Sequence, residues 1–205
     1  MSSILLVRPA NNAVAIELSS WAAGLRNLAA ASGHVSIGSD LASGSATRPA
    51  VDAALPGYEG LFFFGHGTPT KLLGAGVDLV DTSNVALAAN HAIVAIACSS
   101  ADTLGQTAVH QNGVEAYLGF TRKLTWVTGD PDGQFEPAIC SGPRRLIQYG
   151  TMNDALADMQ SELQNVVNHY HSGAGKATAN AAIGFLSAFW DLNHLALIGN
   201  GSYTL

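Results

Sequence analysis

Short apolar segments alternate along the chain with longer segments in which apolar residues recur every three or four positions. The apolar segments are too short for helices, so they predict buried β-strands. These strands are expected at residues 3–7, 34–37, 61–64, 92–97, 114–120 and 194–198. Such alternation predicts a mostly parallel six-stranded sheet with helices on both faces, a three-layer α-β-α sandwich.

The periodic segments predict helices at residues 13–31, 50–55, 84–89, 103–110, 151–170 and 176–190. The fifth of these begins at a capping box, in which the side chains of Thr151 and Asp154 each accept a hydrogen bond from the other residue's backbone N–H. Glycines set among alternating valines at residues 72–81 predict a β-hairpin outside the main sheet. The Gly-, Pro- and Asp-rich residues 128–137 predict a long loop.

Composition and charge narrow the class of protein. The 205 residues, 48% of them hydrophobic, suffice for one domain with a sizeable core, so residues 1–205 are expected to form a single domain. Only 12% of residues are charged and the net charge is -6, which argues against nucleic acid as a partner. Neither a secretory leader nor a membrane-spanning run is evident, so we expect a cytoplasmic protein with no membrane partner.

The most promising chemistry lies just beyond two of the predicted strands. His66 follows the third strand and Cys98 the fourth, and the carboxyl ends of neighbouring parallel strands share one edge of the sheet. The helix expected from Thr103 would favour a thiolate at Cys98. A buried structural thiol and a hydrogen-bonded structural histidine are the alternatives that these residues leave open.

The segments around the two residues, LFFFGHGTP and AIVAIACSSADTLG, resemble the dyad motifs of a known clan of cysteine peptidases. The clan includes caspases, gingipains, legumain, separase and the bacterial CHAT-domain peptidases, and the likeness is strongest to the gingipain and CHAT types. The last residues, HLALIGNGSYTL, are similar to the terminal strand of those two types, although Asn200 and Gly201 replace their usual sequence. The resemblance covers nearly the whole chain and implies a caspase-like fold.

What the resemblance implies is hydrolysis of peptide bonds through an acyl-enzyme. Cys98 would be the nucleophile and His66 the general acid and base. The backbone N–H groups of Gly67 and Cys98 would form the oxyanion hole. No metal or organic cofactor is implied; the expected partners are a protein or peptide substrate and an activating or regulatory protein.

Two loops offer charges for substrate binding, and they suggest opposite preferences. In caspases and gingipains the loop after the first strand supplies such a charge; here it holds Arg8 and Asn11, and Arg8 would favour an acidic residue before the cut. The loop after the fifth strand holds Asp130 and Asp132, which would favour a basic one. Solvated loop charges with no role are the third possibility, so the sequence leaves the preference open.

Two other functions fit parts of the sequence. An α/β-hydrolase also places a nucleophile after a strand, but its histidine would have to be His110 or His194, and residues 96–100 lack the glycines of its elbow. A flavodoxin-like binding domain, or an inactive member of the peptidase clan, would keep the fold without using the dyad.

Overall fold

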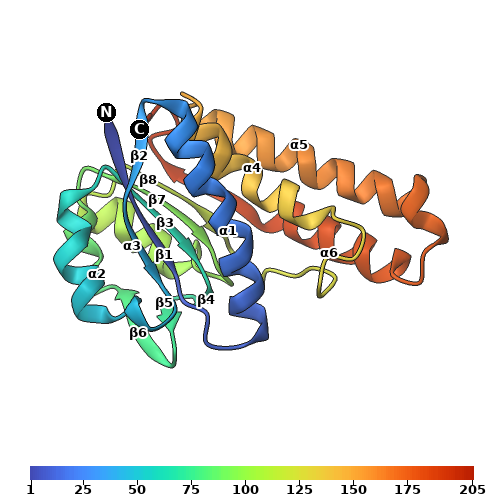
Figure 1. The fold of residues 1–205 in the computed structure, drawn as a ribbon, viewed down its shortest axis with the longest axis horizontal. Helices are drawn as coiled ribbons and strands as arrows, with labels where there is room; N and C mark the ends of the chain where they lie inside the picture. The colour runs from blue at the N-terminus through green and yellow to red at the C-terminus, as the bar shows by residue number, and fades with distance from the viewer.

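The computed structural model describes residues 1–205, and its centre is a six-stranded sheet (Figure 1). The strand order is β2-β1-β3-β7-β8-β9, and every neighbouring pair is parallel except β8 and β9. The strands are β1 (Ser2–Arg8), β2 (Val35–Ala42), β3 (Gly60–Phe64), β7 (Ala92–Ile96), β8 (Ala116–Phe120) and β9 (Leu195–Gly199). The six predicted strands and their mostly parallel arrangement are therefore confirmed.

Neighbouring side chains along the central strands enter two different cores. In β3, Phe62 and Phe64 join the larger apolar cluster, whereas Leu61 and Phe63 join the smaller one. Successive residues of a strand point to opposite faces, so an entirely apolar strand predicts burial on both. This is why the sheet strands read as continuous apolar segments instead of alternating ones.

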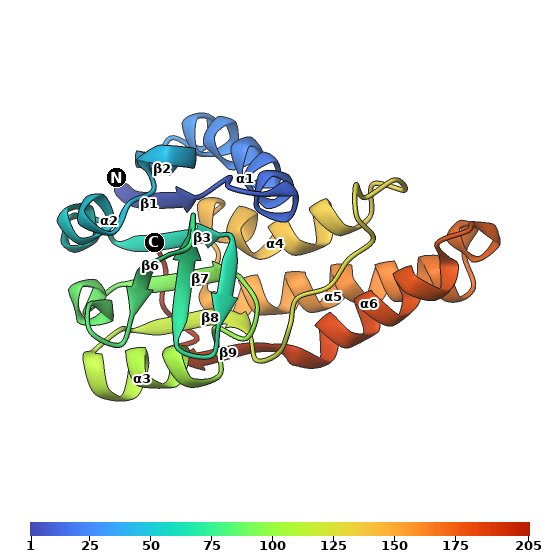
Figure 2. The same ribbon diagram turned by 90° about the horizontal axis from the view of Figure 1, so that it is seen from below.

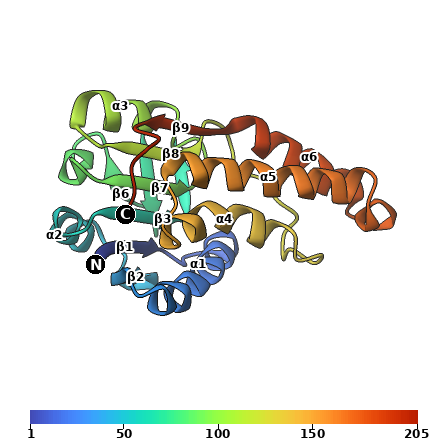
Figure 3. The same cartoon turned by 90° about the horizontal axis from the view of Figure 1, so that it is seen from above.

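Helices cover both faces of the sheet. The larger cluster unites the sheet with α1 (Ala13–Ser32), α4 (Phe135–Ile147) and α5 (Met152–His171), which cross in front of the strands in Figure 3. The smaller cluster unites it with α2 (Arg48–Ala54) and α3 (Thr103–Asn112). The helix α6 (Ala181–His194) runs back along α5, and the two together extend well beyond the sheet (Figure 2). None of these helices is both long and apolar enough to span a bilayer.

A small antiparallel sheet follows β3, as the hairpin pattern predicted. It consists of β4 (His66–Thr68), β5 (Lys71–Gly74) and β6 (Val77–Asp81) in that order. Its first strand begins at His66 itself, so one side of the candidate site belongs to a sheet and not to a free loop. A 3-10 helix (Val85–Ala88) replaces the α-helix expected at residues 84–89.

The loop predicted at residues 128–137 is only partly confirmed, because a helix that the sequence did not predict begins within these residues. Helix α4 starts at Phe135, and both Gly142 and Pro143 lie inside it. Asp130 caps its first turn by accepting hydrogen bonds from the backbone N–H groups of Phe135 and Glu136. By contrast, the capping box of α5 at Thr151 and Asp154 is confirmed.

Candidate active site

Two adjacent strands bring His66 and Cys98 to the same edge of the sheet. In the parallel pairing of β3 and β7, Phe64 lies opposite Ile96. The N–H of Gly65 then donates to the carbonyl oxygen of Ile96 at 3.1 Å, which extends the register by one step. His66 and Cys98 each follow that register pair by two positions, so the sheet itself sets their proximity.

Gly67 allows the two segments to meet at van der Waals distance. A β-carbon at this position would lie 2.5 Å from the carbonyl oxygen of Cys98 and 2.9 Å from the Cβ of Ala97. No larger residue fits there without moving backbone atoms. The backbone N–H of Cys98 donates to no other residue, so it is free to receive an oxyanion.

The turn after Cys98 has an uncommon backbone conformation. Ser99 has a φ of 55°, in the left-handed region that residues other than glycine rarely adopt. Its N–H donates to the carbonyl oxygen of Arg122 at 2.8 Å, which fixes the turn against the segment after β8. Backbone strain of this kind concentrates at functional sites.

Asn12 holds the imidazole of His66 and was missed in the sequence. Its Oδ1 caps α1 by accepting from the N–H of Ala15 at 3.0 Å. This contact fixes the side-chain amide, and Nε2 of His66 lies 2.7 Å from its Nδ2 and 3.0 Å from its Oδ1. The sequence signal was present, since an Asn directly before a periodic segment marks a helix N-cap. It gave no hint that the same residue reaches His66.

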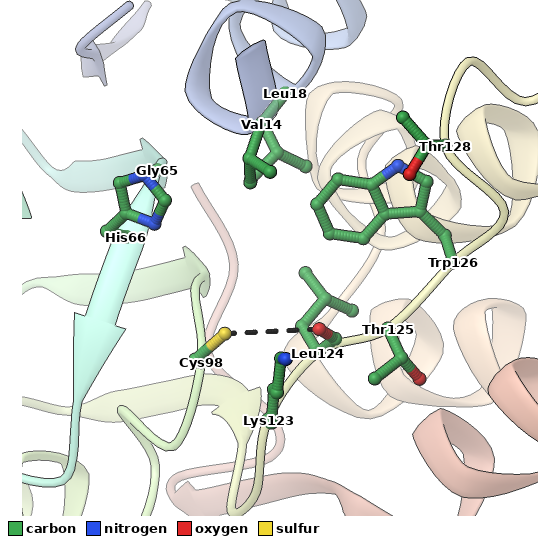
Figure 4. Close-up of a pocket in the computed structure, with 10 residues that line it drawn as sticks. All are labelled: Val14, Leu18, Gly65, His66, Cys98, Lys123, Leu124, Thr125, Trp126 and Thr128. Carbon is green, nitrogen blue, oxygen red and sulfur yellow. Dashed lines mark hydrogen bonds between the residues drawn. The ribbon is translucent and has the colours of Figure 1, made fainter. Parts of the chain in front are cut away.

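His66 and Cys98 both line one cavity of about 340 Å³ (Figure 4). No hydrogen bond joins them; the thiol of Cys98 instead donates to the carbonyl oxygen of Leu124 at 3.9 Å. The Nδ1 of His66, which Asn12 leaves free, lies on the Cys98 side of the ring in Figure 4. The lining residues are Val14, Leu18, Gly65, His66, Cys98, Lys123, Leu124, Thr125, Trp126 and Thr128.

Burial raises the pKa of the Cys98 thiol above its ordinary value. The positive charge of Lys123 acts in the opposite direction. Lys123, which takes part in no ion pair, is the cation that favours the thiolate.

The opposite wall of the cavity is the segment from Lys123 to Thr128, and α6 fixes it in place. The buried carboxylate of Asp191 accepts from the N–H of Thr125 at 3.0 Å and from its Oγ1 at 3.2 Å. The indole N–H of Trp190 donates to the carbonyl oxygen of Lys123 at 2.8 Å. Burial raises the pKa of Asp191 well above its usual range. This residue was also missed in the sequence.

None of the four residues suggested for substrate binding lines the cavity. The guanidinium of Arg8 pairs with Asp40 at 2.8 Å. Asp130 caps α4, and Asp132 accepts a hydrogen bond from the hydroxyl of Tyr170 at 2.9 Å. Asn11 is exposed to solvent, whereas its neighbour Asn12 contacts the site. The geometry thus supplies neither charge that the two loops suggested.

The residues required by an α/β-hydrolase lie elsewhere. His194 bonds to the carbonyl oxygen of Trp190 at 2.7 Å, and His110 is exposed at the end of α3. Neither lines the cavity. The second thiol, Cys140, is fully buried in α4, and burial raises its pKa to about 12.

Comparison with known proteins gives a result for the fold but none for the sequence. No protein-family model matches the chain, and neither does the sequence of any curated protein. Six chains of solved structures are similar, among them those of the two structures that follow. The crystal structure of the Arg-specific cysteine proteinase gingipain R has a TM-score of 0.62 and 14% identity over 99% of this chain and 46% of its own. A complex of the pro- and mature domains of RgpB from Porphyromonas gingivalis gives 0.61 and 14% over 99% and 47%.

The chain thus spans about half the length of each of these structures. At 14% identity, the TM-scores of 0.62 and 0.61 show a shared fold alone. The activity has to be argued from the site. Likeness to CHAT-domain peptidases in particular stays a prediction. The protein has the caspase-like α/β fold of gingipain R, with a mostly parallel six-stranded sheet between layers of helices.

Proposed function

We propose that the protein is a cysteine endopeptidase in which Cys98 is the nucleophile and His66 the general acid and base. One observation carries the proposal. Both residues follow a register pair of adjacent parallel strands by two positions and line the same cavity. The structural likeness to a cysteine proteinase supports it, because that protein shares the fold over nearly all of this chain.

The reaction would proceed in two steps. In the first, the thiolate of Cys98 attacks the carbonyl carbon of the scissile bond, the C–N bond breaks, and the imidazolium of His66 gives its proton to the leaving amine. In the second, His66 takes a proton from water, the resulting hydroxide attacks the thioester carbonyl, the C–S bond breaks, and His66 returns the proton to the sulfur of Cys98. The products are a carboxylic acid and the free thiol, which restores the enzyme.

The negative oxygen formed in each step needs hydrogen-bond donors. The N–H of Cys98 is free of other partners, and Gly67 brings a second backbone segment against it. One such donor contributes about 3 kcal/mol in comparable acyl-transfer sites. Asn12 would keep the imidazole of His66 turned toward the nucleophile throughout.

We further propose that a second protein regulates the peptidase. The thiol of Cys98 is bonded to the carbonyl oxygen of Leu124 and not to His66, so the dyad is not yet engaged. A shift of the Leu124 segment, or the arrival of a substrate, would release the thiol toward His66. One of the similar structures is itself a complex of a pro- and a mature domain, which supports control by an additional protein.

Cleavage profiling with matched variants tests the proposed function. Purified protein is added to a native cell extract, so that any activating protein is present, and new peptide termini are identified by mass spectrometry. We expect new termini with the wild type and with Cys140→Ala, and none with Cys98→Ala. Removing the nucleophile should lower the rate by roughly 10⁴-fold or more.

Two results would contradict this reading. Cleavage that survives Cys98→Ala would remove the nucleophile from the proposal. Cleavage that survives His66→Ala but is lost in His194→Ala would favour the α/β-hydrolase alternative. His66→Ala alone is expected to lower kcat/KM by roughly 10²–10⁴-fold, the usual contribution of a general acid and base.

A further inference from the structure

We propose that the residue before the scissile bond has an uncharged, apolar side chain of the size of Leu, Met or Phe. This inference rests on the proposed function, since it identifies the substrate class of the same site. It follows from the walls of the cavity beside Cys98, which differ from both charge preferences that the sequence suggested.

The part of the cavity facing the dyad is built from apolar side chains. Val14 and Leu18 enter from successive turns of α1, and Leu124 and Trp126 enter from the segment after β8 (Figure 4). Trp126 packs against Trp21 of α1, with ring centroids 5.4 Å apart. A substrate side chain directed away from the dyad would therefore meet a hydrocarbon and indole surface.

No carboxylate is available there to receive an arginine or lysine side chain. No acidic residue lines the cavity, and the acidic groups nearby are already engaged. Asp191 is buried and bonded to Thr125, and Glu17 accepts from the N–H of Gly129 at 2.9 Å. A basic side chain would lose its hydration without gaining an ion pair, which is strongly unfavourable.

Lys123, which also lines the cavity, disfavours a basic side chain further. Although its backbone belongs to the opposite wall, its side chain lies near Cys98 in Figure 4, away from Val14 and Trp126. An acidic side chain among Val14, Leu18 and Trp126 would thus be too far from the ammonium group of Lys123 to form an ion pair with it. The hydroxyl of Thr125 offers it little, because that group already bonds to Asp191. Apolar side chains match the surface formed by Val14, Leu18 and Trp126 best.

Peptides that differ only in the residue before the cut test this preference. The first measurement compares kcat/KM for fluorogenic peptides ending in Leu, Met, Phe, Asp and Arg. The second compares the rate at which the matching peptidyl chloromethyl ketones alkylate Cys98, located by mass. We expect both rates to be at least about tenfold higher for the apolar series than for Asp or Arg, because an unpaired buried charge is costly.

Two substitutions in α1 make the test specific to the cavity wall. Val14 is 38% exposed, so Val14→Asp adds a carboxylate without disturbing the core. It should raise the Arg-to-Leu ratio of kcat/KM by about tenfold or more. Ile16, on the same helix, is 55% exposed and lines no cavity, so Ile16→Asp should leave that ratio unchanged.

The outcomes separate this inference from the function on which it rests. Cleavage that depends on Cys98 but prefers Asp or Arg overturns the apolar preference and leaves the peptidase intact. Alkylation of Cys98 with an apolar preference but without cleavage, even when the native cell extract is present, overturns the peptidase and supports the binding preference. Equal alkylation by all five reagents overturns the inference, as does an equal response to Val14→Asp and Ile16→Asp.

Discussion

The two walls of the cavity are built in different ways. On one side, His66 and Cys98 follow neighbouring strands whose register sets their spacing. On the other, the segment from Lys123 to Thr128 is irregular, and side chains from α6 determine its position. The first wall carries the chemistry and inherits the rigidity of the sheet. The second shapes the binding surface and depends on contacts that can be changed one at a time.

Gly67→Ala should damage the strand wall most. Its new β-carbon would press against the carbonyl oxygen of Cys98, so the nucleophile and its N–H must move. We expect a loss in kcat/KM of about 10²-fold, because displacement of the reacting atoms is costly. Gly57→Ala is the control, since that position has open space around it. Unchanged kcat/KM in Gly67→Ala would show that the close approach has no role in catalysis.

Substitutions of Asn12 should separate its two tasks. Asn12→Ala removes the cap of α1 and should lower the free energy of unfolding by about 1 kcal/mol. Asn12→Ser keeps a capping oxygen but is too short to hold the ring of His66. We expect kcat to fall about tenfold in both variants, with stability lost only in the first. Chemical denaturation and steady-state kinetics measure the two effects, and normal kcat in Asn12→Ser would contradict this role.

Asp191→Asn tests the loop wall through pH. Burial raises the pKa of Asp191 in the folded state, so its contribution to stability is full below its unfolded pKa of about 3.9 and is lost as pH rises. Asn does not titrate. The free energy of unfolding of Asp191→Asn should therefore increase relative to that of the wild type as pH rises above about 4. Urea unfolding measures this, with Asp158→Asn as the control because the side chain of Asp158 is 47% exposed. Parallel pH profiles of Asp191→Asn and wild type would contradict the prediction.

Lys123→Met should produce the smallest change. The side-chain charge lowers the pKa of Cys98, while the backbone of Lys123 alone holds Trp190. Its loss should move the midpoint of Cys98 alkylation by iodoacetamide to higher pH and slow the reaction at pH 7 by a few fold. Lys176→Met, far along the chain and exposed, should leave the profile unchanged. An identical profile for Lys123→Met would show that this charge does not act on the thiol.

The strand wall could be predicted from the sequence for a physical reason. Strands buried on both faces show as short apolar segments, and their carboxyl ends share one edge, so His66 and Cys98 could be placed before any coordinates. Gly67 could also be identified as part of the site, because it directly follows His66 in the sequence. The positions of His66 and Cys98 at this edge could therefore be predicted from the two apolar strand segments that precede them.

The loop wall could not be predicted, because its determinants are distant in sequence. Thr125 and Asp191 lie 66 positions apart, and no periodicity links them. Helix α4 was missed because Gly142 and Pro143 read as helix-breaking residues, whereas Asp130 and burial against α5 stabilise the helix. The charges of Arg8 and Asp132 were visible, but their partners Asp40 and Tyr170 appear only in three dimensions.

Trapping the acyl-enzyme tests the central claim most directly. An activated peptide ester acylates a cysteine peptidase faster than water releases the product, so rapid acid quenching should capture the thioester. Peptide mapping by mass spectrometry is predicted to find the acyl group on Cys98, with Cys140 unmodified. An acyl group on Ser99, Ser100 or Cys140, or turnover of the ester with Cys98 replaced by Ala, would contradict the assignment of Cys98 as the nucleophile.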